Sequence, residues 1–339
     1  VVESRVNDAF QYGLTEGNSA LREQLVGLCR QRGIETQSDR LLITSGSQQA
    51  LDLLIRALAD EGDVFVVERP TYLATLQILG LTGATVKSVG SDEHGMIVDE
   101  LEELLQTTRI KCVYVVPTFG NPSGTTRSGE RREKLVRLAA EHSFMIIEDD
   151  PYGEIAFTDR REKPLLQVAT ELGCEAHVAY TSTFSKILAP GLRVGWIILP
   201  EWMKQKVAII KQATDLHANA FAQSLVSAYL SLDRLAPQIA LIRDAYQQKC
   251  LRLSQLLTEE LGEHLTFNQP EGGMFLWATF REARDTTAWL QQTLAKGVVY
   301  VPGEFFFSDN PDRRTLRFSY ATATDEQLVE AVSRLKAAL

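Results

Sequence analysis

Short runs of consecutive apolar residues alternate, over the first two thirds of the chain, with longer stretches in which apolar residues recur at helical spacing. Short apolar runs are typical of strands buried on both faces of a parallel sheet, and the stretches between them are typical of covering helices. The pattern predicts strands over 41–44, 64–68, 84–89, 111–117, 144–150, 176–183 and 193–200, and helices over 19–33, 48–60, 98–106, 129–142 and after Tyr72. We therefore expect a mainly parallel sheet with helices on both faces.

The pattern changes after about residue 200, where long helices take over, including an amphipathic stretch near 234–261. Strand-like segments follow at 274–280, 297–302 and 315–320, with helices near 283–295 and 324–338. This mixture predicts a smaller α+β domain. The sequence thus predicts an α/β protein with an N-terminal segment over 1–35, a three-layer αβα large domain over 36–235 and a small C-terminal domain over 236–339.

Composition narrows the class of protein. Apolar residues make up 45% of the 339 residues, which is enough for a large core. A formal net charge of −9 argues against a protein that coats nucleic acid. The four cysteines are far apart, no apolar run approaches the about 20 residues of a membrane span, and we expect no signal peptide. These features predict a cytoplasmic protein without membrane contact. The opening VVESRV resembles the middle of a chain, so we expect upstream residues to be missing.

Polar residues follow several of the predicted strands, at the edge where open parallel sheets bind ligands. The run Thr44-Ser45-Gly46-Ser47-Gln48 opens a helix, whose free N–H groups suit an anion; an ordinary serine N-cap is the alternative. Asn121 follows the strand 111–117 and either turns its amide to a ligand or only marks a turn.

Asp149 and Asp150 end the apolar strand 144–150 and precede Tyr152. Carboxylates in this setting are costly unless they are paired or solvated. They could bind a metal, although none of the five histidines lies nearby, or they could hold the nitrogen of a cationic heterocycle. Both options stay open at this point.

Lys186 lies in a turn of small polar residues between two apolar strands. A surface lysine is the ordinary interpretation, but the apolar flanks suggest partial burial, which lowers an amine's pKa and makes it a better nucleophile. Arg193 could grip a phosphate, and Arg317 suits a carboxylate unless it is a surface arginine on an edge strand. Together these residues suit a phosphorylated cofactor that has a carbonyl group and a basic ring nitrogen, and pyridoxal phosphate has all three features.

In these motifs the sequence resembles the fold-type I pyridoxal-phosphate aminotransferases, closest to the 2-aminoadipate/kynurenine branch and the aminotransferase-like domains of MocR regulators. The resemblance runs from Tyr12-Gly13 to Arg317-Phe318-Ser319-Tyr320 and rests on Ser-Gly-Ser-Gln-Gln, Asn-Pro-Ser-Gly, Asp-Asp-Pro-Tyr and Thr-Phe-Ser-Lys…Pro-Gly-Leu-Arg-Val-Gly, in this order. It implies a transaminase that moves an amino group from an L-amino acid to a 2-oxo acid, with 2-oxoglutarate as the expected acceptor. It also implies a homodimer, with segment 1–35 packed against the small domain and the partner.

The resemblance assigns roles by position. Lys186 is implied to form a Schiff base with the cofactor, Asp149 to pair with its pyridine nitrogen, and Asn121 and Tyr152 to bond its ring hydroxyl. Tyr72 is implied to stack on the ring, and Arg317, beside Asn121, to bind the substrate carboxylate. The residues implied to hold the phosphate are Gly46, Ser47, Gln48, Thr183, Ser185 and Arg193, and Tyr12 is implied to reach the phosphate of the neighbouring subunit.

Three alternatives stay open. Lyases, decarboxylases and cyclising synthases share this cofactor site, and a MocR-type regulator would use the same domain to bind an effector. A penicillin-binding serine enzyme is a third, because Thr183-x-x-Lys186 and Ser308-Asp309-Asn310 mimic its motifs, although the nucleophile would be a threonine. Phe305, Phe306 and Tyr320 are apolar candidates for the substrate pocket and equally for the core.

Overall fold

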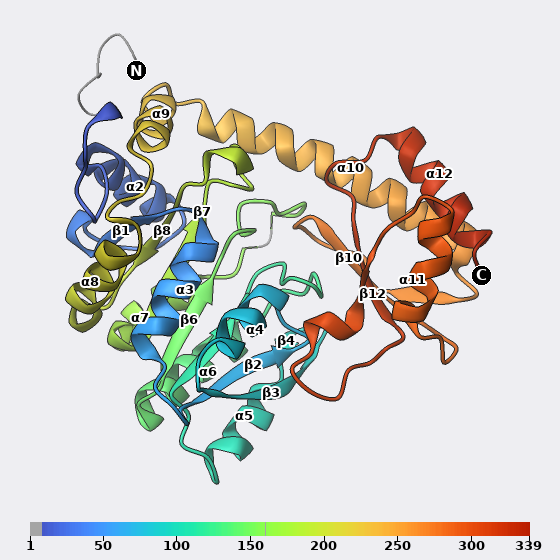
Figure 1. The fold of residues 1–339 in the computed structure, drawn as a ribbon, viewed down its shortest axis with the longest axis horizontal. Coiled ribbons are helices and arrows are strands. Elements are labelled where there is room, and N and C mark those ends of the chain that lie inside the picture. The colour runs from blue at the N-terminus through green and yellow to red at the C-terminus, as the bar shows by residue number, and fades with distance from the viewer. Residues whose placement is uncertain (1–8, 160) are drawn as a thin grey trace.

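The computed structural model describes residues 9–159 and 161–339. Its larger part is built on an eight-stranded sheet with the order β1-β8-β7-β6-β5-β2-β3-β4 (Figure 1). The strands are β1 (Leu41–Thr44), β2 (Val64–Arg69), β3 (Thr85–Asp92), β4 (Gly95–Met96), β5 (Cys112–Val115), β6 (Met145–Asp149), β7 (Val178–Thr183) and β8 (Gly195–Ile198).

Five adjacent strands of this sheet, β3, β2, β5, β6 and β7, are parallel, which confirms the prediction of a mainly parallel sheet. β8 runs antiparallel to β7 and β1, and β4 runs antiparallel to β3. The apolar pattern could not reveal these directions, because a strand buried on both faces looks the same either way. The connection from Thr183 to Gly195 is shorter than the dozen or more residues that a parallel crossover needs.

Helices cover both faces of this sheet, so the predicted three layers are confirmed. Successive strand residues point to opposite faces: Val66 and Ile146 belong to one apolar cluster, whereas Phe65 and Ile147 belong to the other. The first cluster contains side chains of α2 (Ser19–Gln31), α5 (Val98–Leu105), α6 (Gly129–His142), α7 (Leu165–Glu171) and α9 (Ala220–Leu230), and the second contains side chains of α3 (Ser47–Leu58), α4 (Leu73–Gly80) and α8 (Lys204–Asp215).

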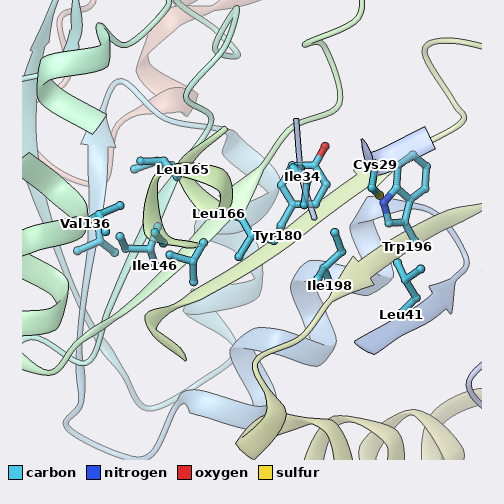
Figure 2. Close-up of a cluster of buried hydrophobic side chains, with 14 of the residues drawn as sticks. Cys29, Ile34, Leu41, Val136, Ile146, Leu165, Leu166, Tyr180, Trp196 and Ile198 are labelled. Atoms are coloured by element: carbon cyan, nitrogen blue, oxygen red, sulfur yellow. The ribbon is translucent and has the colours of Figure 1, made fainter. Parts of the chain in front are cut away.

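The helix α2 packs on the large sheet, although segment 1–35 was expected to pack with the small domain and a partner. Leu21, Leu25 and Cys29 are fully buried in the first cluster, and Figure 2 shows Cys29 beside Trp196 of β8. The apolar stripe of α2 fits between α9 and the strands β1 and β8, which is the physical reason for this placement. Residues 1–8 lie outside the described residues.

The C-terminal part has its own sheet and core. α10 (Leu235–Leu261) runs from the large part to this smaller one, and β11 (Val301–Pro302), β12 (Thr315–Ser319), β10 (Phe275–Phe280) and β9 (Leu265–Phe267) form an antiparallel sheet in that order (Figure 1). α11 (Thr286–Ala295) and α12 (Asp325–Lys336) supply further buried side chains. The expected strand over 297–302 shrinks to two residues, and β9 was not predicted because its apolar run is short. The domain boundaries stay a prediction.

Five short 3₁₀ helices complete the described elements: η1 (Ser38–Arg40), η2 (Glu175–His177), η3 (Pro190–Leu192), η4 (Glu201–Met203) and η5 (Gly303–Phe306). Within residues 9–159 and 161–339, no single helix has the length and apolar composition needed to cross a bilayer, although α9 and α10 meet those criteria as a pair bent by 93°.

Candidate functional site

The carboxylate of Asp149 lies at the end of β6, buried to 3% exposure, with one of its two oxygens unpartnered. Its Oδ2 accepts a hydrogen bond of 2.9 Å from the buried hydroxyl of Tyr114 on β5, while Oδ1 has no hydrogen-bond partner. Burial raises the pKa of Asp149 to about 7, and the Tyr114 hydrogen bond opposes this rise. A buried carboxylate with a free oxygen is prepared for a cationic or N–H partner.

Asp150 points to the other face of the sheet, as strand alternation requires. Its two oxygens accept hydrogen bonds of 2.9 Å from the Tyr180 hydroxyl and from the backbone N–H of Gly153. A cavity of about 910 Å³ lies on this side, lined in part by Arg32, Asp150 and Glu154 and by none of the predicted site residues. Both carboxylate oxygens of Asp150 therefore have hydrogen-bond partners within the protein, whereas one oxygen of Asp149 has none.

Arg317 of β12 meets Asn121 across the two parts of the molecule, with Nη1 donating to Asn121 Oδ1 at 2.6 Å. The guanidinium carbon lies 4.0 Å from the ring centroid of Phe275 and 5.0 Å from that of Phe306. These rings hold the guanidinium plane, and the Nε of Arg317 is buried without a hydrogen-bond partner. Tyr152 packs edge-on against the same Phe275 ring, so Asn121, Tyr152 and Arg317 converge.

The turn before α3 requires a glycine at position 46, because φ is +82° there and an added Cβ would lie 2.5 Å from Arg193 Nη2. Arg193 donates through Nη2 to the carbonyl of Ser45 (3.2 Å) and through Nη1 to the hydroxyl of Ser185 (3.1 Å). The N-cap is Gly46 and no side chain caps it, so the alternative of an ordinary serine N-cap is wrong. Orphan N–H groups beside an arginine suit an anion.

Lys186 follows β7 and is partly buried, as its apolar flanks predicted. Burial lowers the pKa of its ammonium, and the nearby charges of Arg193 and Arg317 lower it further, while Asp149 acts in the opposite direction. Thr183 is buried and its hydroxyl donates to the carbonyl of Val194 at 3.1 Å. The hydrogen-bond acceptors of this hydroxyl are the Val194 carbonyl and the Ser185 hydroxyl, and neither is a base that could activate it, which disfavours the serine-enzyme alternative.

Two predicted tyrosines, Tyr72 and Tyr12, lie in different surroundings. Tyr72 donates its hydroxyl to Gln48 Oε1 at 3.2 Å, which ties the segment after β2 to the turn over residues 44–48 that leads into α3 (the anion turn). Tyr12 is 83% exposed and packs edge-on against His217, apart from the other site residues.

The candidates Phe305, Phe306 and Tyr320 have different surroundings. Phe306 and Tyr320 are fully buried, whereas Phe305 is exposed to 52%. Tyr320 donates to the carbonyl of Gly272 within the C-terminal core, so it is a core residue, while Phe306 touches Arg317.

Sequence reasoning missed Tyr114 and Phe275. A signal for Tyr114 exists, because a tyrosine inside the otherwise apolar run Val113–Val116 needs a buried partner for its hydroxyl. Its partner is 35 residues away in sequence, and only the sheet order brings the two strands together. Phe275 carries no such signal, since an aromatic residue in an apolar strand is ordinary.

Tyr114→Phe is expected to raise the pKa of Asp149, because the lost hydrogen bond stabilises only the ionised carboxylate. A hydrogen bond to a charged group is worth 1.5–3 kcal/mol, so the shift is about one to two pH units. If turnover needs ionised Asp149, the acid limb of the kcat/KM profile moves to higher pH by that amount. An unchanged acid limb would contradict this coupling.

Comparison with known proteins identifies the family. Residues 4–335 match the family described as "Aminotransferase class I and II". The chain is also 39% identical to Aromatic-amino-acid aminotransferase 1 of Thermococcus litoralis, over 99% of this chain and 81% of that protein. This chain belongs to the aminotransferase class I and II family. The predicted family, fold type, transaminase activity and pyridoxal phosphate cofactor are thereby confirmed.

Two further relatives of this aminotransferase support the assignment. The 2-aminoadipate transaminase of Thermus thermophilus is 34% identical, over 98% of this chain and 82% of that protein. The crystal structure of Pyrococcus horikoshii kynurenine aminotransferase, in complex with PMP and with kynurenine as substrate, superposes with a TM-score of 0.93 at 39% identity, over 99% of this chain and 84% of the other. Both lie in the branch that the motifs indicated.

Proposed function

We propose that this aminotransferase works at the site formed by Asp149, Lys186, Asn121, Tyr152 and Arg317. It moves the amino group of an L-amino acid to a 2-oxo acid, with 2-oxoglutarate as the acceptor. The observation that carries the proposal is the unpartnered Oδ1 of buried Asp149, with a partly buried lysine and a stacked arginine within the same electrostatic environment.

Each chemical group of pyridoxal phosphate finds a suitable partner in the described residues. Asp149 Oδ1 suits the pyridine nitrogen, and Asn121 with Tyr152 suits the ring hydroxyl. The Gly46 turn, without a Cβ and beside Arg193, suits the phosphate, together with Ser47, Gln48, Thr183 and Ser185. Tyr72 would stack on the ring. The residues present therefore fit the cofactor.

When bound, pyridoxal phosphate supplies an aldehyde and an electron-withdrawing ring to the amino group and Cα of the substrate. Arg317 holds the substrate carboxylate with its planar guanidinium, which the rings of Phe275 and Phe306 keep in place. Lys186 Nζ would take the proton from Cα as a general base and, as a general acid, would deliver it to the carbonyl carbon of the cofactor. Its lowered pKa favours the unprotonated amine that the first of these steps requires.

The residues around Arg317 support donors with apolar or aromatic side chains. The charges of Arg193 and Arg317 act on Lys186. Arg193 would bind the phosphate, and Arg317 would bind the α-carboxylate. The nearby rings of Phe275 and Phe306 suit aromatic and branched side chains. Donors of the 2-aminoadipate type are the competing class.

A donor panel with 2-oxoglutarate tests this function. Wild-type protein is expected to convert aromatic amino acids to their 2-oxo acids, detected by chromatography. Arg317→Leu is expected to lower kcat/KM by about 10- to 100-fold, mainly through KM, because it loses a charge-assisted hydrogen bond to the carboxylate. If none of the tested donors leads to the formation of glutamate, transamination is refuted. A product formed with release of carbon dioxide would favour a decarboxylase.

We further propose a homodimer in the cytoplasm. Phe10 stacks on Phe221 with ring centroids 5.7 Å apart, although these residues are 62% and 39% exposed. Tyr12, Leu14 and Leu225 add exposed apolar surface on the same segments. A second copy covering this patch would bring Tyr12 to the neighbour's phosphate, and sedimentation of the purified protein as a monomer would contradict the dimer.

A further inference from the structure

The side chain of Lys211 on α8 is completely buried, and nothing in the mechanism above uses it. Its Nζ lies 2.6 Å from Asp215 Oδ1, one helical turn further along. Burial lowers the pKa of Lys211, which reflects the cost of taking an ammonium out of water. The Asp215 side chain is 23% exposed, so only the lysine of this pair is fully buried. Replacing a buried ion pair by apolar residues is often neutral for stability, so stability alone does not explain the position of Lys211.

The ion pair is connected to the anion turn through one side chain. Asp215 Oδ2 accepts a hydrogen bond of 2.7 Å from Gln49 Nε2, and Gln49 Oε1 accepts one of 2.7 Å from the backbone N–H of Ser45. Because Asp215 is an acceptor, it fixes the orientation of the Gln49 amide with its oxygen towards Ser45. Lys211 in turn holds the Asp215 carboxylate in place through its 2.6 Å contact.

The turn is thus fixed at three backbone atoms. Gln49 holds the N–H of Ser45, Arg193 holds the carbonyl of Ser45 at 3.2 Å, and the hydroxyl of Thr44 holds the carbonyl of Gly46 at 3.0 Å. The first N–H groups of α3, which follow directly, have no partner inside the helix. Their direction depends on how firmly the turn is held.

We propose that Lys211 and Asp215 are positioning residues that act through Gln49 to orient the anion turn for the cofactor's phosphate. This inference rests on the proposed use of the turn as the phosphate site. A merely structural role, joining α8 to α3, is the alternative. The two differ in their effect on a ligand without a phosphate, because only the first acts through the turn.

The test compares the binding of pyridoxal phosphate and of pyridoxal, which lacks the phosphate, to cofactor-free protein by equilibrium titration. The double variant Lys211→Met/Asp215→Leu removes both charges and leaves no unpaired buried ion. We expect about tenfold weaker binding of pyridoxal phosphate, the scale of one well-placed hydrogen bond, and unchanged binding of pyridoxal. Gln49→Met is expected to have the same effect, and adding it to the double variant should weaken binding no further.

Arg56→Met is the matched control. Arg56 donates to the hydroxyl of Thr214 and so also joins α3 to α8, but it does not touch the turn. It is expected to leave both affinities unchanged. The proposal would be overturned if the double variant bound both ligands more weakly by the same factor, or if it bound both as tightly as the wild type does. If the wild-type protein bound pyridoxal phosphate and pyridoxal with equal affinity, the assignment of the turn to the phosphate would be wrong.

Discussion

Lys186→Ala is expected to lower kcat by about three to four orders of magnitude, since positioned general acid–base catalysis contributes up to that much. The variant loses the amine that we propose moves the Cα proton, and no other lysine acts on Asp149 among its electrostatic neighbours in the described residues. Cofactor binding is expected to persist, because the Asp149 and Arg193 contacts remain. Steady-state transamination kinetics measure the loss, and equilibrium titration measures the binding.

Lys163→Ala supplies the control for that experiment. Lys163 is an exposed lysine whose ammonium pairs with Glu171 at 2.9 Å on the surface. Its loss is expected to leave kcat near the wild-type value. If Lys186→Ala retained turnover within tenfold of wild type, the role of Lys186 as proton carrier would be refuted.

Asp149→Asn is expected to lower kcat by about 10²–10³-fold, which is typical for removal of one preorganised electrostatic group. The amide keeps the size of the carboxylate, and its oxygen can still accept the Tyr114 hydrogen bond, but it cannot stabilise a positive charge on a ring nitrogen. The effect should therefore appear in kcat far more than in KM, as steady-state kinetics would show.

Asp150→Asn is the matched control, one residue further along the same chain. Asp150 bonds the Tyr180 hydroxyl and the Gly153 N–H on the other side of the sheet, away from Lys186. Its replacement is expected to lower the melting temperature and leave kcat almost unchanged. A larger loss of kcat in Asp150→Asn than in Asp149→Asn would show that the wrong carboxylate has been assigned.

The sequence predicts much of this fold because its strands are buried on both faces and stand out as continuous apolar runs. Strand direction does not show in such runs, and for β8 only the short connection after β7, which excludes a parallel crossover, indicates the reversal. Candidate site residues stand out in the sequence where their chemistry conflicts with packing, as with Asp149 at the end of an apolar strand or Lys186 between two of them, and their roles stay predictions.

The supporting residues were much harder to predict. Gln49 and Asp215 are 166 positions apart, and a glutamine in the first turn of a helix is unremarkable in a sequence. Lys211 appears as an ordinary charged residue in α8 until the structure shows it completely buried. Such contacts follow from how helices pack on the sheet, which a single sequence does not specify.

The most direct test of the account is to locate the lysine that carries the cofactor. Purified protein loaded with pyridoxal phosphate is treated with borohydride, which makes the covalent link permanent, and is then digested and analysed by mass spectrometry. We expect the phosphopyridoxyl mass on the peptide containing Lys186 and its absence from the Lys186→Ala protein. The label on another lysine, or no label on a protein that transaminates, would contradict it.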